Sequence, residues 1–159
     1  MANVEQFLQS HHIEYILHEH PAVFTCEEAE KHCVNVPGLA GKNLFLRSEK
    51  SARYFLVVLP AAKRADLKKV AEMVGERRIS FANADILREK LGLEPGSVSP
   101  FGLINDVKSE VKVYIDKEVY DADVVNFHPN TNTASLELSR DMFHRYLKAL
   151  NRDVHIVEL

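Results

Sequence analysis

The spacing of apolar residues divides the chain into short helices separated by strands. Apolar positions three or four residues apart, preceded by a capping side chain or followed by glycine, predict amphipathic helices. Thr25 with Glu28 has the spacing of a capping box, and Asp66, Asn83 and Ser139 are N-cap residues by type. Helices are therefore expected over Val4–Ser10, Thr25–Cys33, Asp66–Gly75, Asn83–Gly92 and Ser139–Leu150.

Alternating or continuous apolar runs predict the strands. They cover Glu14–His18, Gly41–Arg47, Arg53–Pro60, Ile79–Phe81, Val111–Asp116, Val124–His128, Thr133–Leu138 and Val154–Val157. Ile79–Phe81 is expected to be buried, and Val111–Asp116 to have one buried face. Several connections are shorter than the dozen residues that a parallel crossover needs. The pattern predicts an α+β fold, with a mixed, largely antiparallel sheet flanked by helices.

The segment from Glu94 to Asn105 fits neither pattern. It is too rich in Gly, Ser and Pro for a regular element and too apolar for an ordinary surface loop. We therefore interpret it as a loop that builds a functional site.

Composition narrows the class of protein. A length of 159 residues with 46% hydrophobic and 27% charged residues suits one compact domain, residues 1–159. The formal net charge of −3 argues against a protein that coats nucleic acid, so any nucleic-acid contact should be local. No apolar run is long enough for a membrane span and no secretory signal is evident, which leads us to expect a cytoplasmic protein without membrane contact.

Cys26 and Cys33 are expected to be free thiols. They lie seven residues apart on a predicted helix, too far apart to hold one tetrahedral ion, and we expect neither a metal nor another cofactor.

Widespread catalytic signatures are absent from the sequence, so the candidate chemistry rests on three features. Lys42 and Asn43 open a buried strand, where an ammonium suits a phosphate or hydroxyl, although surface lysines are common and the residues alone favour a solvated strand-end lysine. Gly96 and Gly102 would let backbone groups approach a ligand, or would merely shape a connector. His128 ends a strand at a turn, where such a histidine is more often structural.

Four segments in this order resemble the free-standing prolyl-tRNA editing proteins of the YbaK/ProX superfamily. They are Pro21–Thr25, Gly41–Leu46, Pro95–Asn105 and Asn126–Pro129. The match spans nearly the whole chain, and the long third segment is the most specific. The resemblance implies the editing-domain fold, which is related to the editing insertion of bacterial prolyl-tRNA synthetases.

It also implies a trans-acting hydrolase that removes a wrong amino acid, most similar to the alanine-specific branch, from tRNA for proline. Its essential lysine maps onto Lys42, and its substrate contacts map onto Thr25, Asn43, Gly96, Ser97, Ser99, Phe101, Gly102 and His128. The implied partner is the aminoacylated tRNA acceptor end, with prolyl-tRNA synthetase as a further candidate; the oligomeric state is left open. The alternatives are a deacylase for cysteine or serine on tRNA and a non-catalytic aminoacyl-tRNA-binding module.

Overall fold

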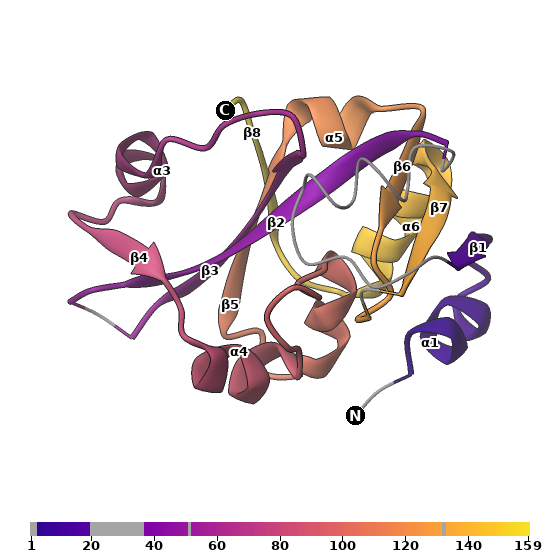
Figure 1. Ribbon diagram of the computed structural model, residues 1–159, viewed down its shortest axis with the longest axis horizontal. Helices are drawn as coiled ribbons and strands as arrows, with labels where there is room; N and C mark the ends of the chain where they lie inside the picture. Colours follow the sequence, from indigo (N-terminus) through magenta and orange to yellow (C-terminus); the bar gives the residue numbers. More distant parts are fainter. Residues whose placement is uncertain (1–2, 20–36, 51, 132) are drawn as a thin grey trace.

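In a computed structural model, the described residues are 3–19, 37–50, 52–131 and 133–159. They form one eight-stranded sheet with helices packed against it (Figure 1). The helices are α1 (Val4–Ser10), α3 (Leu67–Val74), α4 (Ala84–Leu91), the 3-10 helix η1 (Pro100–Asn105), α5 (Lys117–Asp121) and α6 (Arg140–Ala149). The strands are β1 (Ile16–Glu19), β2 (Leu39–Ser48), β3 (Tyr54–Pro60), β4 (Ile79–Phe81), β5 (Val111–Asp116), β6 (Val124–Phe127), β7 (Ala134–Ser139) and β8 (Val154–Val157). None of the helices in these ranges is both long and apolar enough to cross a bilayer.

The long strand β2 lies at the centre of the sheet, whose order is β1-β7-β6-β2-β3-β5-β8. The pairs β2–β3, β6–β7, β1–β7 and β2–β4 are antiparallel, whereas β2–β6, β3–β5 and β5–β8 are parallel. The parallel pair β3–β5 is joined through residues 61–110, ample for a crossover. The predicted α+β class, with a mixed and largely antiparallel sheet, is confirmed.

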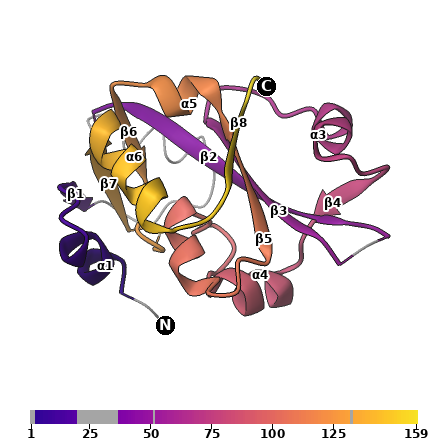
Figure 2. The ribbon, with the colours of Figure 1, turned by 180° about the vertical axis from the view of Figure 1, so that it is seen from behind.

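The two faces of the central strands pack into different cores. On one face, Phe45 of β2 and Val58 of β3 join the larger core, together with residues of α4, η1 and α6. On the other face, Leu46 and Val57 pack against Val70 of α3. Figures 1 and 2 show α3, β4 and the tip of the β2–β3 hairpin at one end of the molecule, and α6, β6 and β7 at the other. Strand β2 therefore connects the two ends.

The helix boundaries follow the predicted caps. The Asp66 carboxylate accepts the backbone N–H of Lys68 at 3.0 Å, and α3 ends at Gly75, whose φ of +77° glycine adopts without strain. Asn83 and Ser139 cap α4 and α6 in the same manner. The expected helix over residues 25–33 lies outside the described residues.

Two expectations about strand burial are wrong. Phe81 at the end of β4 is 59% exposed, because this three-residue strand extends the sheet beside β2 without a helix over the ring. In β5, Tyr114 and Asp116 are buried as well as Val113. The strand lies between β3 and β8 in parallel pairings, and parallel strands are covered on both faces.

Two regular elements escaped the sequence pattern. The segment 94–105, expected to be irregular, ends in the 3-10 helix η1, which Ser99 caps by accepting the N–H of Phe101 at 3.1 Å. Helix α5 was not predicted at all. It has five residues, and Val119 is its one buried side chain, so it carries no apolar period.

Candidate active site

Part of one edge of β2 has no strand partner among the described residues. Along its other edge β2 pairs with β3 from Gly41 to Arg47. On the open edge it pairs with β6 only at Leu39 and Ala40, and with β4 only from Leu46 onward. The gap lies between these two short pairings, and the segment after α4 approaches it. The side-chain amide of Asn43 donates to the carbonyl oxygen of Val98 across 3.2 Å.

Asn43 also carries an acceptor that the fold leaves unused. Its Oδ1 atom is buried and has no hydrogen-bond partner in the structure. A buried polar atom without a partner costs about 1–3 kcal/mol, so it calls for a physical explanation. A hydroxyl or amine of a bound substrate would supply the missing donor.

The segment from Glu94 to Ser99 is shaped by a glycine and closed by local hydrogen bonds. Gly96 has a φ of +89°, which side chains other than glycine rarely adopt. The N–H of Ser97 donates to Glu94 O at 3.0 Å and closes the turn. Arg88 holds the start of the segment with two bonds to the Glu94 carboxylate, and these charge-assisted bonds lower the pKa of Glu94. These bonds fix the conformation of residues 94–97, which precede the part of the segment that contacts β2.

Ser99 joins this segment to the end of β6. Its hydroxyl is fully buried and donates to the backbone carbonyl of His128. The imidazole of His128 lies with Nδ1 at 2.9 Å from the carbonyl oxygen of Ala134 on β7. A carbonyl only accepts, so this contact places a hydrogen on Nδ1 and fixes the orientation of the ring. Asn43, Ser99 and His128 are brought together from three distant parts of the chain.

Phe101 and Gly102, also predicted to contact substrate, are buried packing positions. The Phe101 ring is fully buried and meets Tyr146 edge-on, with ring centroids 4.9 Å apart. A Cβ at Gly102 would lie 2.6 Å from Leu93 Cδ1, so this glycine lets η1 pack against the end of α4. These residues hold the segment in place, and their contact with substrate stays a prediction.

Lys42 lies on the opposite face of β2 from Asn43. In the β2–β3 register Lys42 is opposite Leu59 and Asn43 is opposite Val58. Directly paired residues share a face, and Leu59 belongs to the core against α3, whereas Val58 belongs to the larger core. Lys42 is half-buried and makes no ion pair or side-chain hydrogen bond with another described residue. A substrate lying along the open edge would meet Lys42 from one face and Asn43 from the other. Thr25 lies outside the described residues.

Two residues that support the site were not predicted from the sequence. The hydroxyl of Tyr146 donates to Pro100 O at 2.6 Å from within the core, and burial raises the pKa of this phenol well above its usual value. Asn130 adopts a φ of +64° in the turn after His128, and its amide donates to Phe101 O at 3.4 Å. The turn itself was expected, but its contact with η1 joins residues 29 apart and leaves no local sequence signal.

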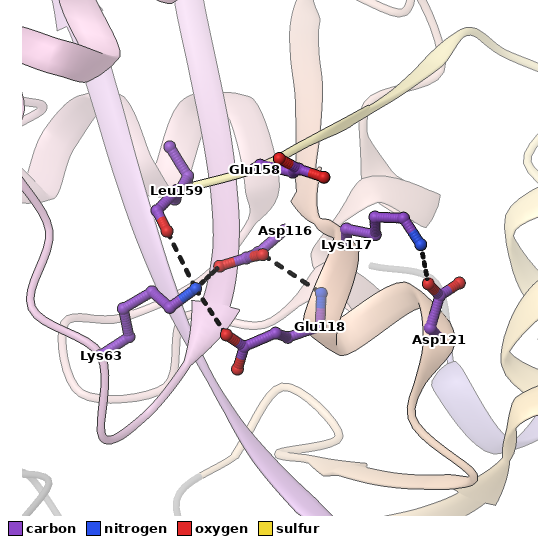
Figure 3. A pocket seen from close by; sticks show the side chains of 7 residues that line it. All are labelled: Lys63, Asp116, Lys117, Glu118, Asp121, Glu158 and Leu159. Atoms are coloured by element: carbon purple, nitrogen blue, oxygen red, sulfur yellow. Dashed lines mark hydrogen bonds and ion pairs between the residues drawn. The ribbon is translucent and has the colours of Figure 1, made fainter.

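A separate pocket of about 490 Å³ contains none of the predicted site residues. In Figure 3 the Lys63 side chain reaches toward other residues that line this pocket, with its ammonium 2.8 Å from Asp116 Oδ2, 2.9 Å from Glu118 Oε1 and 2.9 Å from Leu159 O. These bonds, chiefly the one to Asp116, raise the pKa of Lys63. Lys117 pairs with Asp121 in the same way. Both lysines of this pocket are therefore paired within the chain, and carboxylates outnumber cations in its lining.

Known proteins resemble the chain over most of its length. Residues 20–146 match the aminoacyl-tRNA editing domain. The chain belongs to this family. The prolyl-tRNA editing protein ProX of Acetoanaerobium sticklandii is 39% identical over 147 residues, covering 92% of this chain and 90% of that protein. The prolyl-tRNA synthetase associated domain-containing protein 1 of Mus musculus is 33% identical over 156 residues, covering 96% and 92%.

Solved structures confirm the editing-domain fold. The hypothetical protein APE2540 superposes with a TM-score of 0.77 at 19% identity, covering 99% of this chain and 98% of its own. A candidate trans-editing enzyme for prolyl-tRNA synthetase gives a TM-score of 0.72 at 24% identity, covering 99% and 94%. The resemblance drawn from the four sequence segments is therefore confirmed, and the editing-domain match includes Lys42, the 94–105 segment and His128.

Proposed function

We propose that this chain hydrolyses the ester that joins alanine to tRNA for proline. Its membership of the aminoacyl-tRNA editing family supports the reaction class, and a 39% identical relative is named a prolyl-tRNA editing protein. The observation that carries the proposal is the group at the open edge of β2, where Asn43, Ser99 and His128 are held together and Asn43 Oδ1 lacks a donor.

Hydrolysis of the ester requires mainly that the protein position the substrate and water. An aminoacyl ester is already activated, so water adds to its carbonyl carbon, the bond to the ribose oxygen breaks, and that oxygen leaves with a proton. The products are the free amino acid and uncharged tRNA. Lys42 would hold a phosphate or the developing negative charge through its ammonium. Asn43 Oδ1 would accept a hydrogen bond from the terminal ribose or from the substrate amine.

Selection of alanine over proline would follow from size. A pocket that accepts a larger residue discriminates against a smaller one by only about 1–3 kcal/mol, so a synthetase built for proline makes alanine errors. A second, smaller pocket admits alanine and excludes proline. His128 would form part of that wall, because its ring is fixed against β7 by the bond to Ala134.

A deacylation panel tests the proposal. The purified chain is given tRNA for proline charged with alanine, cysteine, serine or proline, with and without a chelator, and release of the amino acid is followed. We expect the alanyl substrate to be hydrolysed fastest, with no effect of the chelator. Faster release of cysteine or serine would change the assigned substrate, and binding without turnover would replace the enzyme with an aminoacyl-tRNA-binding module.

A further inference from the structure

The end of the molecule that carries β4 has an unusual charge balance. Residues 47–78 contain nine Lys and Arg but four Asp and Glu, although the whole chain has a net charge of −3. Seven of these cations are exposed and form no ion pair with any described residue: Arg64, which follows β3, and Arg47, Lys50, Lys68, Lys69, Arg77 and Arg78. We call the last six of these residues the basic end. Its exposed acids are Glu49, Asp66 and Glu72, so cations remain in excess.

Elsewhere in the described chain five of ten cations have a carboxylate partner, against two of nine within residues 47–78. Arg88, Lys90, Lys117, Arg140 and Arg152 all have carboxylate partners. Cations without a carboxylate partner are therefore more concentrated at the basic end than in the rest of the described chain. Unpaired cations grouped on one surface suit a polyanion, whose phosphates supply the missing charges.

Phe81 lies at the end of β4, three residues after Arg78. Five large apolar side chains of the described residues are exposed, and Phe81, at 59%, is the aromatic one among them. The ring is presented by a fixed backbone, since Phe81 pairs with Leu46 of β2 and the N–H of Ala82 donates to Phe45 O at 3.0 Å. The N–H of Glu49 donates to Arg78 O at 3.2 Å, which brings the arginines beside the hairpin tip. Figures 1 and 2 both show β4 beside α3 and this tip.

The ring also shares a face of β2 with Lys42. Phe81 is opposite Leu46, and residues 42 and 46 of one strand point to the same side. Four residues of strand separate them by about 13 Å. A single strand rising about 3.4 Å per stacked nucleotide, or more when extended, covers this distance with a few nucleotides. The unpaired 3′ end of a tRNA has the length and the charge to reach from one to the other.

We infer that Phe81 is a stacking platform for an unpaired base of the substrate's single-stranded 3′ end, with the basic end holding the neighbouring phosphates. The inference rests on the proposed function for the identity of the nucleic acid. Aromatic rings on single-strand-binding surfaces stack on bases without reading their sequence, and cations beside them bind the backbone. Phe81 would thereby guide the aminoacylated end toward Lys42 at the open edge of β2.

The chain contains no tryptophan, which provides a direct measurement. The variant Phe81→Trp places a single fluorophore at the platform, and Ile156→Trp places one on edge strand β8, at a position 40% exposed, as the control. The probe is an uncharged minihelix of the tRNA acceptor stem with its 3′ overhang, compared with the same minihelix made blunt. We expect the overhang minihelix to quench the Phe81→Trp emission, the blunt one to leave it unchanged, and neither to affect Ile156→Trp.

Affinities complete the test. Phe81→Ala should weaken binding of the overhang minihelix by about 5- to 150-fold, the effect of losing one stacked base, while Phe81→Tyr retains it. Binding of the blunt minihelix should be unaffected by either change. Replacing Arg77 and Arg78 with serine should weaken both minihelices and lower the slope of log affinity against log salt by about 2. Thermal melts check that each variant folds.

Absent quenching, or equal affinity of wild type and Phe81→Ala for the overhang, would overturn the inference. The same result together with normal deacylation of alanyl-tRNA would leave the proposed function standing. If the overhang minihelix quenches the Phe81→Trp emission but the chain hydrolyses no aminoacyl-tRNA, the stacking inference stands and the proposed function fails.

Discussion

The two faces of β2 differ in whether their polar groups have hydrogen-bond or ion-pair partners within the described chain. On the face of the larger core, Asn43 is bonded to Val98, and Ser99 and His128 complete a network within the protein. On the face of α3, Lys42 has no ion pair with a described residue, and the exposed ring of Phe81 on β4 lies beside Leu46, farther along β2. The first face is a framework that folding itself assembles, in which Asn43 Oδ1 alone of these groups has no hydrogen-bond partner. The second offers groups that have no partner among the described residues.

Of the substitutions on the two faces of β2, we expect the one at Lys42 to reduce activity most. Lys42→Ala should lower kcat/KM for alanyl-tRNA by about 100- to 1,000-fold, as expected for the loss of a group that stabilises developing charge. The melting temperature should stay near that of wild type, because the ammonium makes no ion pair with a described residue. Lys42→Arg should restore activity only in part, since a planar guanidinium presents its donors differently.

Lys63 is the matched control for that experiment. Its ammonium is bonded to Asp116, Glu118 and Leu159, so Lys63→Ala should lower the melting temperature and leave kcat/KM near wild type. If the two variants behave alike in both assays, the distinction between the paired Lys63 and the unpaired Lys42 is wrong.

On the framework face, Ser99→Ala should impair folding and catalysis together. It removes the donor to His128 O and the cap of η1, which should cost about 1–3 kcal/mol of unfolding free energy. We expect activity to fall about tenfold, because each 1.4 kcal/mol of lost positioning corresponds to a factor of ten.

Ser139→Ala provides the comparison for Ser99. It also removes a helix cap, at the start of α6, but touches neither the 94–99 segment nor His128. Urea unfolding should report a loss of about 1 kcal/mol with normal turnover. Equal losses of activity in the two variants would show that stability alone accounts for the Ser99 result.

A smaller effect is expected on specificity at His128. His128→Ala opens the wall beside Ala134 and should raise prolyl-tRNA hydrolysis relative to alanyl-tRNA by up to about tenfold, the lower end of what one group's size discriminates. The measurement is the ratio of the two rates in one preparation. An unchanged ratio, with both rates reduced, would assign His128 a purely structural role.

The smallest effect is expected at Tyr146. Tyr146→Phe loses the bond to Pro100 O and should cost about 1 kcal/mol in urea unfolding at pH 7. Because burial raises the pKa of this phenol, the unfolded chain ionises first and the Tyr146 contribution to stability is complete below pH 10 and declines above it. The phenylalanine variant should therefore lose less stability than wild type between pH 9 and pH 11. Identical pH profiles would contradict this account.

Local rules predicted most of the fold. Asp66, Gly75 and Asn83 mark helix ends by the hydrogen bonds that their own side chains or backbone allow, so their positions follow from a few neighbouring residues. The placement of Lys42 and Asn43 on opposite faces also follows from the two-residue period of a strand.

The site could not be predicted in the same way. The Asn43–Val98 bond joins residues 55 apart in the sequence, and the Ser99–His128 bond joins residues 29 apart. Neither leaves a periodic trace: composition and strand ends singled out the segments as candidates, and only the family resemblance brought them together. The exposure of Phe81 was missed because an Ile-Ser-Phe run has the composition of a buried strand, and burial depends on what covers it.

The bond between Tyr146 and Pro100 has a consequence for when the protein becomes active during its synthesis. The 94–105 segment leaves the ribosome early, but the phenol that holds Pro100 lies 46 residues later, on α6. Closing such long loops carries an entropic cost that only the finished contacts offset. A nascent chain stalled before Tyr146 would therefore have Lys42, Ser99 and His128 without the support that fixes their arrangement. Editing activity should appear only once α6 has emerged and packed.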